Sequence, residues 1–191
     1  MDKFLYHKPR ALSKENCLDI IDYFDSSKHY FKPTLNYHAL NGSLIDKRFF
    51  CVKQALEKAL FEYGKKFSVL ESYSNLWGVD TDFNIQKYDI GKAYASNHAL
   101  GYDGQLHCED LGSVECQPRI LAWMFYLNTI KKGGGTYWPY QNFKSKPRQG
   151  SLFIWPAGWT HSHRGIIAPK EEKYIMTGWC KQHNEMCNKY W

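Results

Sequence analysis

The chain has 191 residues, of which 43% are hydrophobic, 17% aromatic and 23% charged. This composition is typical of a globular protein and excludes a disordered or fibrous one, and the length favours one domain over residues 1–191. The net charge of +6 comes from lysines and arginines that are scattered along the sequence, so a nucleic-acid partner is not expected.

The sequence also predicts neither a membrane span nor disulfides. Residues 1–5 contain no apolar signal region, and no stretch approaches the roughly 18 apolar residues of a spanning helix. The six cysteines form no Cys-x-x-Cys pair, so we expect reduced thiols in a cytoplasmic protein. One alternative stays open, because Cys180, His183 and Cys187 are soft ligands that would hold zinc if a fourth joined them.

Two helices are predicted within about the first 80 residues. Ser13 is suited to cap the first helix, which starts near Lys14. Its apolar stripe consists of Leu18, Ile21 and either Ile20 or Phe24. The second helix covers about residues 46–63, and Gly64 is a suitable stop. Its apolar positions are Phe49, Val52, Leu56, Ala59, Leu60 and Tyr63. We expect this amphipathic helix to lie against a sheet.

After about residue 80 the hydrophobic period changes from about 3.6 residues to about 2, which predicts strands. The predicted strands are 83–88, 120–128, 151–155 and 173–179. Glycine and proline at 133–135, 147–150 and 156–158 supply turns for antiparallel connections. Helices followed by short strands predict an α+β fold, in which residues 81–182 form a barrel-like double sheet of the jelly-roll or cupin kind.

Three residues in this second part have the chemistry of a metal site. Two imidazoles and one carboxylate are the ligand set of a mononuclear non-haem Fe(II) centre, which keeps positions open for a co-substrate and dioxygen. In a strand, His107 and Glu109 point to one face while Cys108 points away. His163 supplies a second imidazole. A lone His-x-Glu pattern is weak, since a polar surface strand produces it by chance.

A lysine begins the predicted strand 173–179. Lys173, Ile175, Thr177 and Trp179 share one face of this strand, and Tyr174, Met176 and Gly178 share the other. If the first face lines the barrel interior, Lys173 is a buried cation that needs an anion, either a protein carboxylate or a bound ligand. The alternative is that Lys173 opens an exposed strand and points to solvent.

Several short motifs follow one another between about residues 83 and 180. They are Tyr88-x-x-Gly91-x-x-Tyr94, His107-x-Glu109, Tyr126-Leu127-Asn128, Gly133-Gly134-x-Thr136, Pro147-x-x-Gly150, and His163-x-Gly165 with Lys173 ten residues later. In this order they resemble the Fe(II)/2-oxoglutarate-dependent dioxygenases, specifically the prolyl 4-hydroxylase-like branch with its small viral and bacterial members. Each motif alone is weak, but the ordered set is specific.

The resemblance implies a role for each matching residue. The iron ligands would be His107, Glu109 and His163. Lys173 would bind the distal carboxylate of 2-oxoglutarate. Tyr88 and Tyr126 fall on positions that line or hydrogen-bond the co-substrate, Thr136 falls near one, and Trp179 matches an aromatic wall of the same pocket.

Two histidines compete for these roles. The family often places its first metal histidine four residues after the second tyrosine of the opening motif, which here is His98, but no carboxylate follows at the second position. We therefore favour His107, with Glu109 in place of the usual Asp, and interpret residues 95–105 as a mobile lid with hinges at Gly101 and Gly104. His161 competes with His163, but Gly165 and the step to Lys173 favour His163.

The resemblance implies a distorted double-stranded β-helix with N-terminal flanking helices. Its expected activity is hydroxylation of an unactivated C–H bond, foremost in a prolyl residue of a peptide or protein, with release of succinate and carbon dioxide. Fe(II), 2-oxoglutarate and dioxygen are the expected cofactor and co-substrates, and ascorbate is a further cofactor. The alternatives are a free amino acid or a nucleic-acid base as substrate, and a non-catalytic cupin-like binding module in which the histidines are structural.

Overall fold

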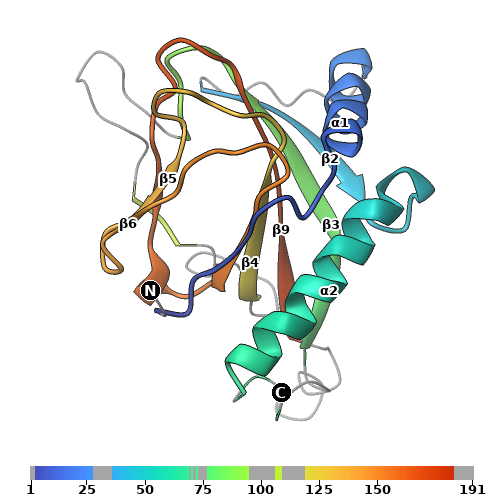
Figure 1. Ribbon diagram of the computed structural model, residues 1–191, viewed down its shortest axis with the longest axis vertical. Coiled ribbons are helices and arrows are strands. Elements are labelled where there is room, and N and C mark those ends of the chain that lie inside the picture. Colours follow the sequence, from blue (N-terminus) through green and yellow to red (C-terminus); the bar gives the residue numbers. More distant parts are fainter. Residues whose placement is uncertain are drawn as a thin grey trace, which may run out of the picture.

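The computed structural model describes residues 3–27, 36–68, 70, 72, 77–94, 106–108 and 119–182, and the statements below concern these residues. Two helices, α1 (Lys14–Ser26) and α2 (Phe50–Lys66), accompany two antiparallel sheets (Figure 1). In space the large sheet runs β1 (Tyr6–Lys8), β7 (Leu152–Pro156), β4 (Arg119–Tyr126), β9 (Lys173–Gln182), β3 (Trp77–Tyr88) and β2 (His38–Ser43). The small sheet runs β6 (Phe143–Lys144), β5 (Thr136–Trp138) and β8 (Arg164–Gly165). Short 3₁₀ helices η1 (Lys47–Phe49) and η4 (Trp159–His161) complete the elements. The antiparallel sheets and the two flanking helices confirm the predicted α+β class.

The predicted order of helices first and strands afterwards is wrong in part. Strands β1 and β2 lie before and after α1, and they form the two edges of the large sheet. β1 has three residues, and β2 has the sequence His-Ala-Leu-Asn-Gly-Ser, so neither has an alternating apolar pattern. Pairing with longer neighbours, β7 and β3, fixes their extended conformation. The short strands β5, β6 and β8 escape prediction for the same reason.

Helix α1 begins where the sequence predicts. Ser13 is extended, and its hydroxyl accepts a hydrogen bond from the amide of Asn16 at 3.0 Å. The predicted apolar stripe is wrong at Leu18, which keeps 42% of its surface exposed. The buried side chains are Cys17, Ile20 and Phe24. Phe24 packs edge-on against Tyr174 of β9 with ring centres 6.0 Å apart, and this contact turns the face bearing Cys17 inward.

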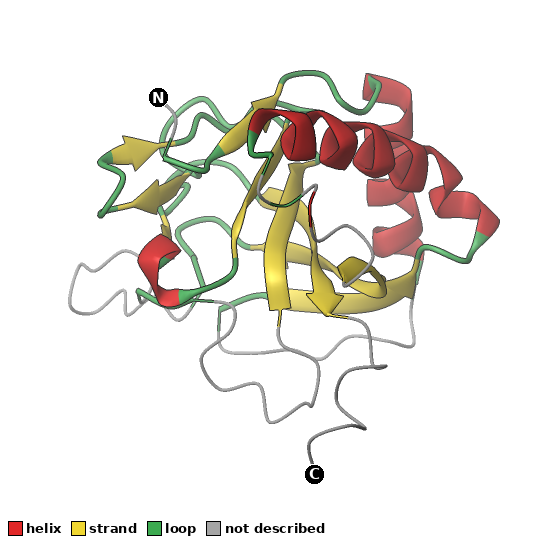
Figure 2. Ribbon diagram, turned by 90° about the horizontal axis from the view of Figure 1, so that it is seen from below, coloured by secondary structure: helices red, strands yellow, loops and turns green. Residues whose placement is uncertain are grey.

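Helix α2 and the preceding η1 bury all the apolar positions predicted for them. These are Phe49, Val52, Leu56, Ala59, Leu60 and Tyr63. They pack against one face of the large sheet, as predicted, and Figure 2 shows both helices on this side. Gly64 is not the stop, because the helix continues to Lys66. A partly exposed glycine lowers helix stability by only about 1 kcal/mol, which need not end a helix held by its buried face.

The central strands of the large sheet are buried on both faces. In β4, Leu121, Trp123 and Phe125 belong to the core on the helix side, and Ala122, Met124 and Tyr126 belong to the core on the side of the small sheet. In β7, Leu152 and Ile154 alternate in the same way with Phe153 and Trp155. Burial on both faces produces a near-continuous apolar run, which accounts for the strong strand signal of these segments.

No helix in the described ranges is long and apolar enough to cross a membrane. The described cysteines Cys17, Cys51, Cys108 and Cys180 are free thiols. Cys180 is fully buried in the core on the helix side, and this burial raises the pKa of its thiol. Because zinc binds the thiolate, these surroundings favour packing for Cys180. Its predicted partners His183 and Cys187, and also Cys116, lie outside the described residues.

Candidate active site

A cavity of about 440 Å³ lies on the face of the large sheet that is turned away from the helices. Alternate residues of β3 and β9 form one wall. They are Asn84, Gln86, Tyr88, Lys173, Ile175, Thr177 and Trp179. The predicted faces of β9 are confirmed, because Tyr174 and Met176 lie in the core on the helix side. Lys173 therefore lies inside the cavity, as one of the two predictions had it, and does not point to solvent.

The two predicted histidine ligands meet in this cavity. His107 and His163 form an isolated antiparallel bridge, in which the His107 amide donates to the His163 carbonyl at 3.0 Å and the His163 amide donates to the His107 carbonyl at 2.7 Å. Their ring centres are 4.5 Å apart. A first-row metal ion lies about 2.1 Å from an imidazole nitrogen, so two imidazoles at right angles around one ion have ring centres about 4.6 Å apart. The pair fits a shared metal ion.

One hydrogen bond decides which nitrogen of His163 carries the proton. Nδ1 lies 3.0 Å from the backbone oxygen of His161. A carbonyl oxygen only accepts, so Nδ1 donates and Nε2 keeps its lone pair in the neutral ring. Trp138 and Trp155 pack against the same imidazole, with ring centres 5.8 and 5.1 Å away. A backbone contact of this kind fixes the ring orientation of a metal-binding histidine.

The competing His161 has both ring nitrogens engaged. Nε2 donates to the backbone oxygen of Lys3 at 2.8 Å, which leaves Nδ1 to accept from the Thr160 hydroxyl at 3.0 Å. Burial lowers the pKa of His161, although the hydrogen bond to the Lys3 carbonyl opposes this shift, so the neutral ring is favoured. The geometry favours a supporting role for His161, which presents its backbone oxygen to His163.

Part of the predicted site lies outside the described residues. This applies to the third ligand Glu109, to the competing His98, and to the predicted lid at 95–105. Within the described ranges, no group of three His, Cys, Asp or Glu side chains is placed to hold a metal ion. The described site therefore contributes two imidazoles, and the full set of two histidines and one carboxylate stays a prediction.

Lys173 brings a buried positive charge into the cavity. The residue is only 3% exposed, and its Nζ lies 4.4 Å from the centre of the Tyr88 ring. The Tyr88 hydroxyl donates to Gln86 Oε1 at 2.7 Å. Gly165 lies close to the ammonium, because a Cβ on this glycine would be 3.6 Å from Nζ. A cation held over an aromatic face in a buried site is suited to bind a carboxylate.

Tyr126 lies one layer behind the cavity wall. Its hydroxyl is 2.9 Å from Thr136 Oγ1 and 2.7 Å from Ser145 Oγ, and all three side chains are buried. Burial raises the pKa of Tyr126 to about 12, so the phenol stays protonated. Thr136 lines the cavity, and Tyr126 is hydrogen-bonded to Thr136 from the core. The predicted contact of Tyr126 with a co-substrate stays a prediction.

Trp179 lines the far end of the β9 wall, where the sequence predicts an aromatic side chain. The guanidinium of Arg119 lies over its ring, 3.9 Å from the centre. Arg119 also lines the cavity, together with Asn84 and Gln86 of β3, and sequence reasoning missed all three. Alternation would have found Asn84 and Gln86, because both share the face of Tyr88 and oppose the apolar Phe83 and Ile85.

Comparison with known proteins gives a consistent set of relatives. No protein-family profile matches the chain. Over 125 residues the sequence is 27% identical to probable prolyl 4-hydroxylase 9 of Arabidopsis thaliana, a match that covers 54% of this chain and 41% of the relative. The chain thus spans less than half the length of that curated relative.

Solved structures share the fold over nearly the whole chain. The viral collagen prolyl hydroxylase of Paramecium bursaria Chlorella virus-1, in complex with 2OG, is 17% identical with a TM-score of 0.63, covering 94% of this chain and 97% of its own. A Pseudomonas putida prolyl-4-hydroxylase is 11% identical with a TM-score of 0.66, covering 94% and 93%. A Trichoplax adhaerens prolyl hydroxylase, in complex with a peptide fragment of hypoxia inducible factor, is 13% identical with a TM-score of 0.66, covering 97% and 86%. The predicted resemblance to prolyl 4-hydroxylases, including small viral and bacterial ones, is therefore confirmed in sequence over part of the chain and in fold over nearly all of it.

Proposed function

We propose that this chain is an Fe(II)- and 2-oxoglutarate-dependent dioxygenase that hydroxylates a prolyl residue in a peptide or protein. The observation that carries the proposal is one cavity that contains two imidazoles with ring centres 4.5 Å apart, His107 and His163, and a buried lysine, Lys173. The sequence and fold relatives support the same activity. We also propose that the two sheets are the halves of a distorted double-stranded β-helix, within one catalytic domain.

His107 and His163 would hold the iron, and Glu109 would complete the set as its carboxylate ligand. The Nε2 lone pair of His163 is directed by the donation of Nδ1 to the His161 carbonyl, so the ring cannot present its protonated nitrogen without breaking that bond. Iron, 2-oxoglutarate and dioxygen, when bound, supply the oxidising chemistry and yield succinate and carbon dioxide. The protein would supply the geometry of the ligands and would limit the access of water.

Lys173 would bind the distal carboxylate of 2-oxoglutarate. Its Nζ stands beside Gly165, which is two residues beyond His163. The ammonium and His163 line the same cavity, so a dicarboxylate bound at the iron would meet the lysine with its distal end. Thr136, which is oriented by Tyr126, lines the same space and offers a hydroxyl to the co-substrate.

Aromatic side chains would exclude water from the reacting end of the cavity. The Tyr94 ring lies 4.6 Å from His107, and Tyr37 stacks on Tyr88 with ring centres 5.2 Å apart. These rings would also provide a surface for an extended proline-containing peptide. We also propose that the protein is cytoplasmic and that its activity requires ascorbate.

A coupled assay tests the proposal. The purified full chain is incubated with Fe(II), 2-oxoglutarate and a set of proline-containing peptides, each paired with a control peptide in which alanine replaces proline. Succinate release and the peptide mass are measured together, and omission of Fe(II) serves as the blank. We expect succinate to form in step with one added oxygen atom on the proline-containing peptide.

Other outcomes identify the rival functions. Turnover of a free amino acid or a nucleobase without turnover of any peptide would move the substrate to that class. If the substrate is a nucleic acid, its binding to the protein should also weaken steeply as the salt concentration rises. A folded protein that binds neither Fe(II) nor 2-oxoglutarate would be the non-catalytic binding module.

A further inference from the structure

Two lysine–tyrosine pairs lie on opposite faces of the sheet where β3 pairs with β9. In this antiparallel ladder Lys87 is opposite Tyr174, and Tyr88 is opposite Lys173. Because neighbouring residues of a strand point to opposite faces, one pair lies on the helix side and the other in the cavity. Lys87 Nζ is 5.3 Å from the Tyr174 ring centre, and Lys173 Nζ is 4.4 Å from the Tyr88 ring centre.

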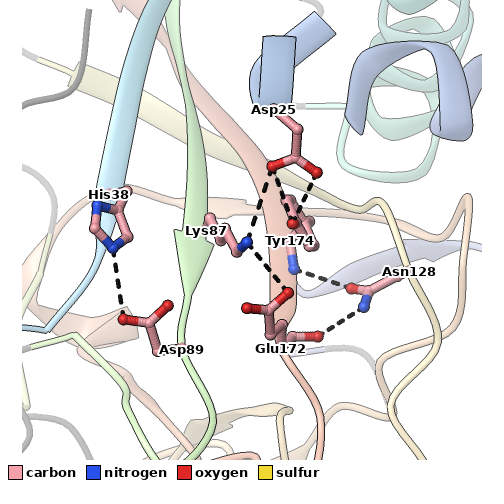
Figure 3. A network of polar contacts seen from close by, with 7 residues as sticks. All are labelled: Asp25, His38, Lys87, Asp89, Asn128, Glu172 and Tyr174. Carbon is pink, nitrogen blue, oxygen red and sulfur yellow. Dashed lines mark hydrogen bonds and ion pairs between the residues drawn. The ribbon is translucent and has the colours of Figure 1, made fainter. Parts of the chain in front are cut away.

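The pair on the helix side is surrounded by carboxylates of the protein, as Figure 3 shows. The Tyr174 hydroxyl donates to both carboxylate oxygens of Asp25, each at 3.1 Å. Lys87 Nζ lies 3.2 Å from Glu172 Oε2 and 3.9 Å from Asp25 Oδ1. We name Asp25, Lys87, Glu172 and Tyr174 the outer cluster. It joins the last turn of α1 to the start of β9.

The backbone on either side of Lys173 is fixed by one further side chain. Asn128 accepts a hydrogen bond from the Tyr174 amide at 2.9 Å and donates to the Glu172 carbonyl at 2.8 Å (Figure 3). Its amide group therefore spans Lys173 from outside the cavity. Together with the outer cluster, it restrains the residues before and after the lysine through both backbone and side chain.

Asp25 is unfavourable for its own helix. It lies in the last turn of α1, where the partial negative charge of the helix end disfavours a carboxylate, and this turn contains no basic residue. A residue that opposes local preference indicates a compensating contact elsewhere. The described compensation is the contact with Tyr174 and Lys87. Asp25 is therefore best explained by what it does to β9.

We propose that Asp25, Lys87 and Tyr174 are positioning residues that set how far the Lys173 ammonium reaches into the cavity. The inference rests on the proposed function, because it assigns Lys173 to the distal carboxylate of 2-oxoglutarate. Fixing the first residues of β9 against α1 keeps Nζ over the Tyr88 ring, and this position determines the length of dicarboxylate that fits between Lys173 and the iron ligands.

The test compares Tyr174→Phe and Asp25→Asn with Asp22→Asn, a change of an exposed acid on the same helix. Tyr174→Phe keeps the ring against Phe24 and removes only the hydroxyl. Calorimetric binding to the full chain with Fe(II), in the absence of oxygen, is measured for 2-oxoglutarate and for its six-carbon homologue 2-oxoadipate. Thermal melting and iron content are measured in parallel.

We expect Tyr174→Phe and Asp25→Asn to weaken 2-oxoglutarate binding by about two- to tenfold, as for loss of one or two hydrogen bonds. The preference for 2-oxoglutarate over 2-oxoadipate should narrow, iron content should stay the same, and Asp25→Glu should recover part of the preference. Asp22→Asn should change nothing. A purely structural contact would lower the melting temperature without altering that preference.

Two results overturn the inference, and they are distinguishable. If the unaltered protein binds 2-oxoglutarate and the variants bind both acids with an unchanged preference, the outer cluster does not position Lys173. If the unaltered protein with bound Fe(II) has no affinity for 2-oxoglutarate, the proposed function itself fails, and the inference fails with it.

Discussion

The two faces of the large sheet are made from the same strands, yet they serve opposite purposes. Toward the helices, Trp123, Phe125 and Met176 close a continuous apolar core with α1 and α2. Toward the cavity, the same strands present polar groups, among them Gln86, Lys173 and Thr177. Burying polar side chains costs free energy unless they are hydrogen-bonded, whereas burying apolar ones is favourable. The helix side can therefore stabilise the sheet while the cavity side is free to carry chemistry.

If this division holds, substitutions on the two faces should have separable effects. Changes on the cavity side should alter ligand binding and leave the free energy of unfolding nearly unchanged. Changes in the apolar core on the helix side should do the reverse, whereas the outer cluster is excluded from this comparison because it is proposed to act on Lys173. Each of the following substitutions tests one half of this comparison.

The largest effect is expected for the histidines of the cavity. His107→Ala and His163→Ala should each remove stoichiometric iron and abolish 2-oxoglutarate turnover, because each would take away one of two imidazole ligands. Thermal unfolding should change little. Metal analysis, succinate release and melting curves measure the three quantities. Full activity in His107→Ala together with loss in His98→Ala would transfer the first ligand to His98.

The next largest effect is expected on the helix side. Leu56 is fully buried between α2 and the sheet, so Leu56→Ala should lower the free energy of unfolding by about 2–5 kcal/mol. Leu18→Ala is the matched control, because Leu18 is largely exposed and its loss should cost less than about 1 kcal/mol. Denaturant titration gives both values. A change in the 2-oxoglutarate affinity of the folded Leu56 variant would break the division between the faces.

Lys173→Met tests the charge of the cavity at nearly constant side-chain length. Loss of a charge-assisted contact worth about 1.5–3 kcal/mol should raise the 2-oxoglutarate concentration needed for half-maximal turnover by about ten- to a hundredfold. Iron content should barely change. The control is Lys53→Met, on the exposed face of α2. An unaltered dependence on 2-oxoglutarate in Lys173→Met would remove this lysine from the site.

The smallest effect is expected at the start of α1. Ser13→Ala removes the cap of the Asn16 amide and should destabilise the protein by about 1 kcal/mol. Ser13→Asp should restore the cap, since a carboxylate accepts the same hydrogen bond and suits a helix start. Both variants should bind 2-oxoglutarate like the unaltered protein. Chemical denaturation, followed by circular dichroism, measures the difference.

Sequence periodicity predicted the parts of the fold in which several residues repeat one signal. The buried face of α2 and the cavity face of β9 are examples, because long alternating or helical patterns leave little choice of orientation. Leu18 shows the limit. In a short helix, two neighbouring rows of residues can fit the helical period equally well. The contact between Phe24 and Tyr174 decides which row is buried.

The sequence predicted several residues that meet in one cavity, but it did not predict their arrangement. The family motifs named His107, His163 and Lys173, yet nothing in the sequence specifies that the two histidines pair across an antiparallel bridge. That pairing depends on strand register, which is set by contacts between distant segments. The same limit applies to Tyr126, whose place behind Thr136 follows from how β4 and β5 pack.

The strand order of the large sheet also has a consequence for how the protein is made. β9 occupies a central place between β4 and β3, and β1 pairs with β7, a strand far along the sequence. On the ribosome, β3 and β4 emerge with unpaired edges long before residues 173–182 can join them. Such non-local pairing slows folding and exposes strand edges to other chains. We therefore expect slow folding and a risk of aggregation until β9 can pair with β3 and β4.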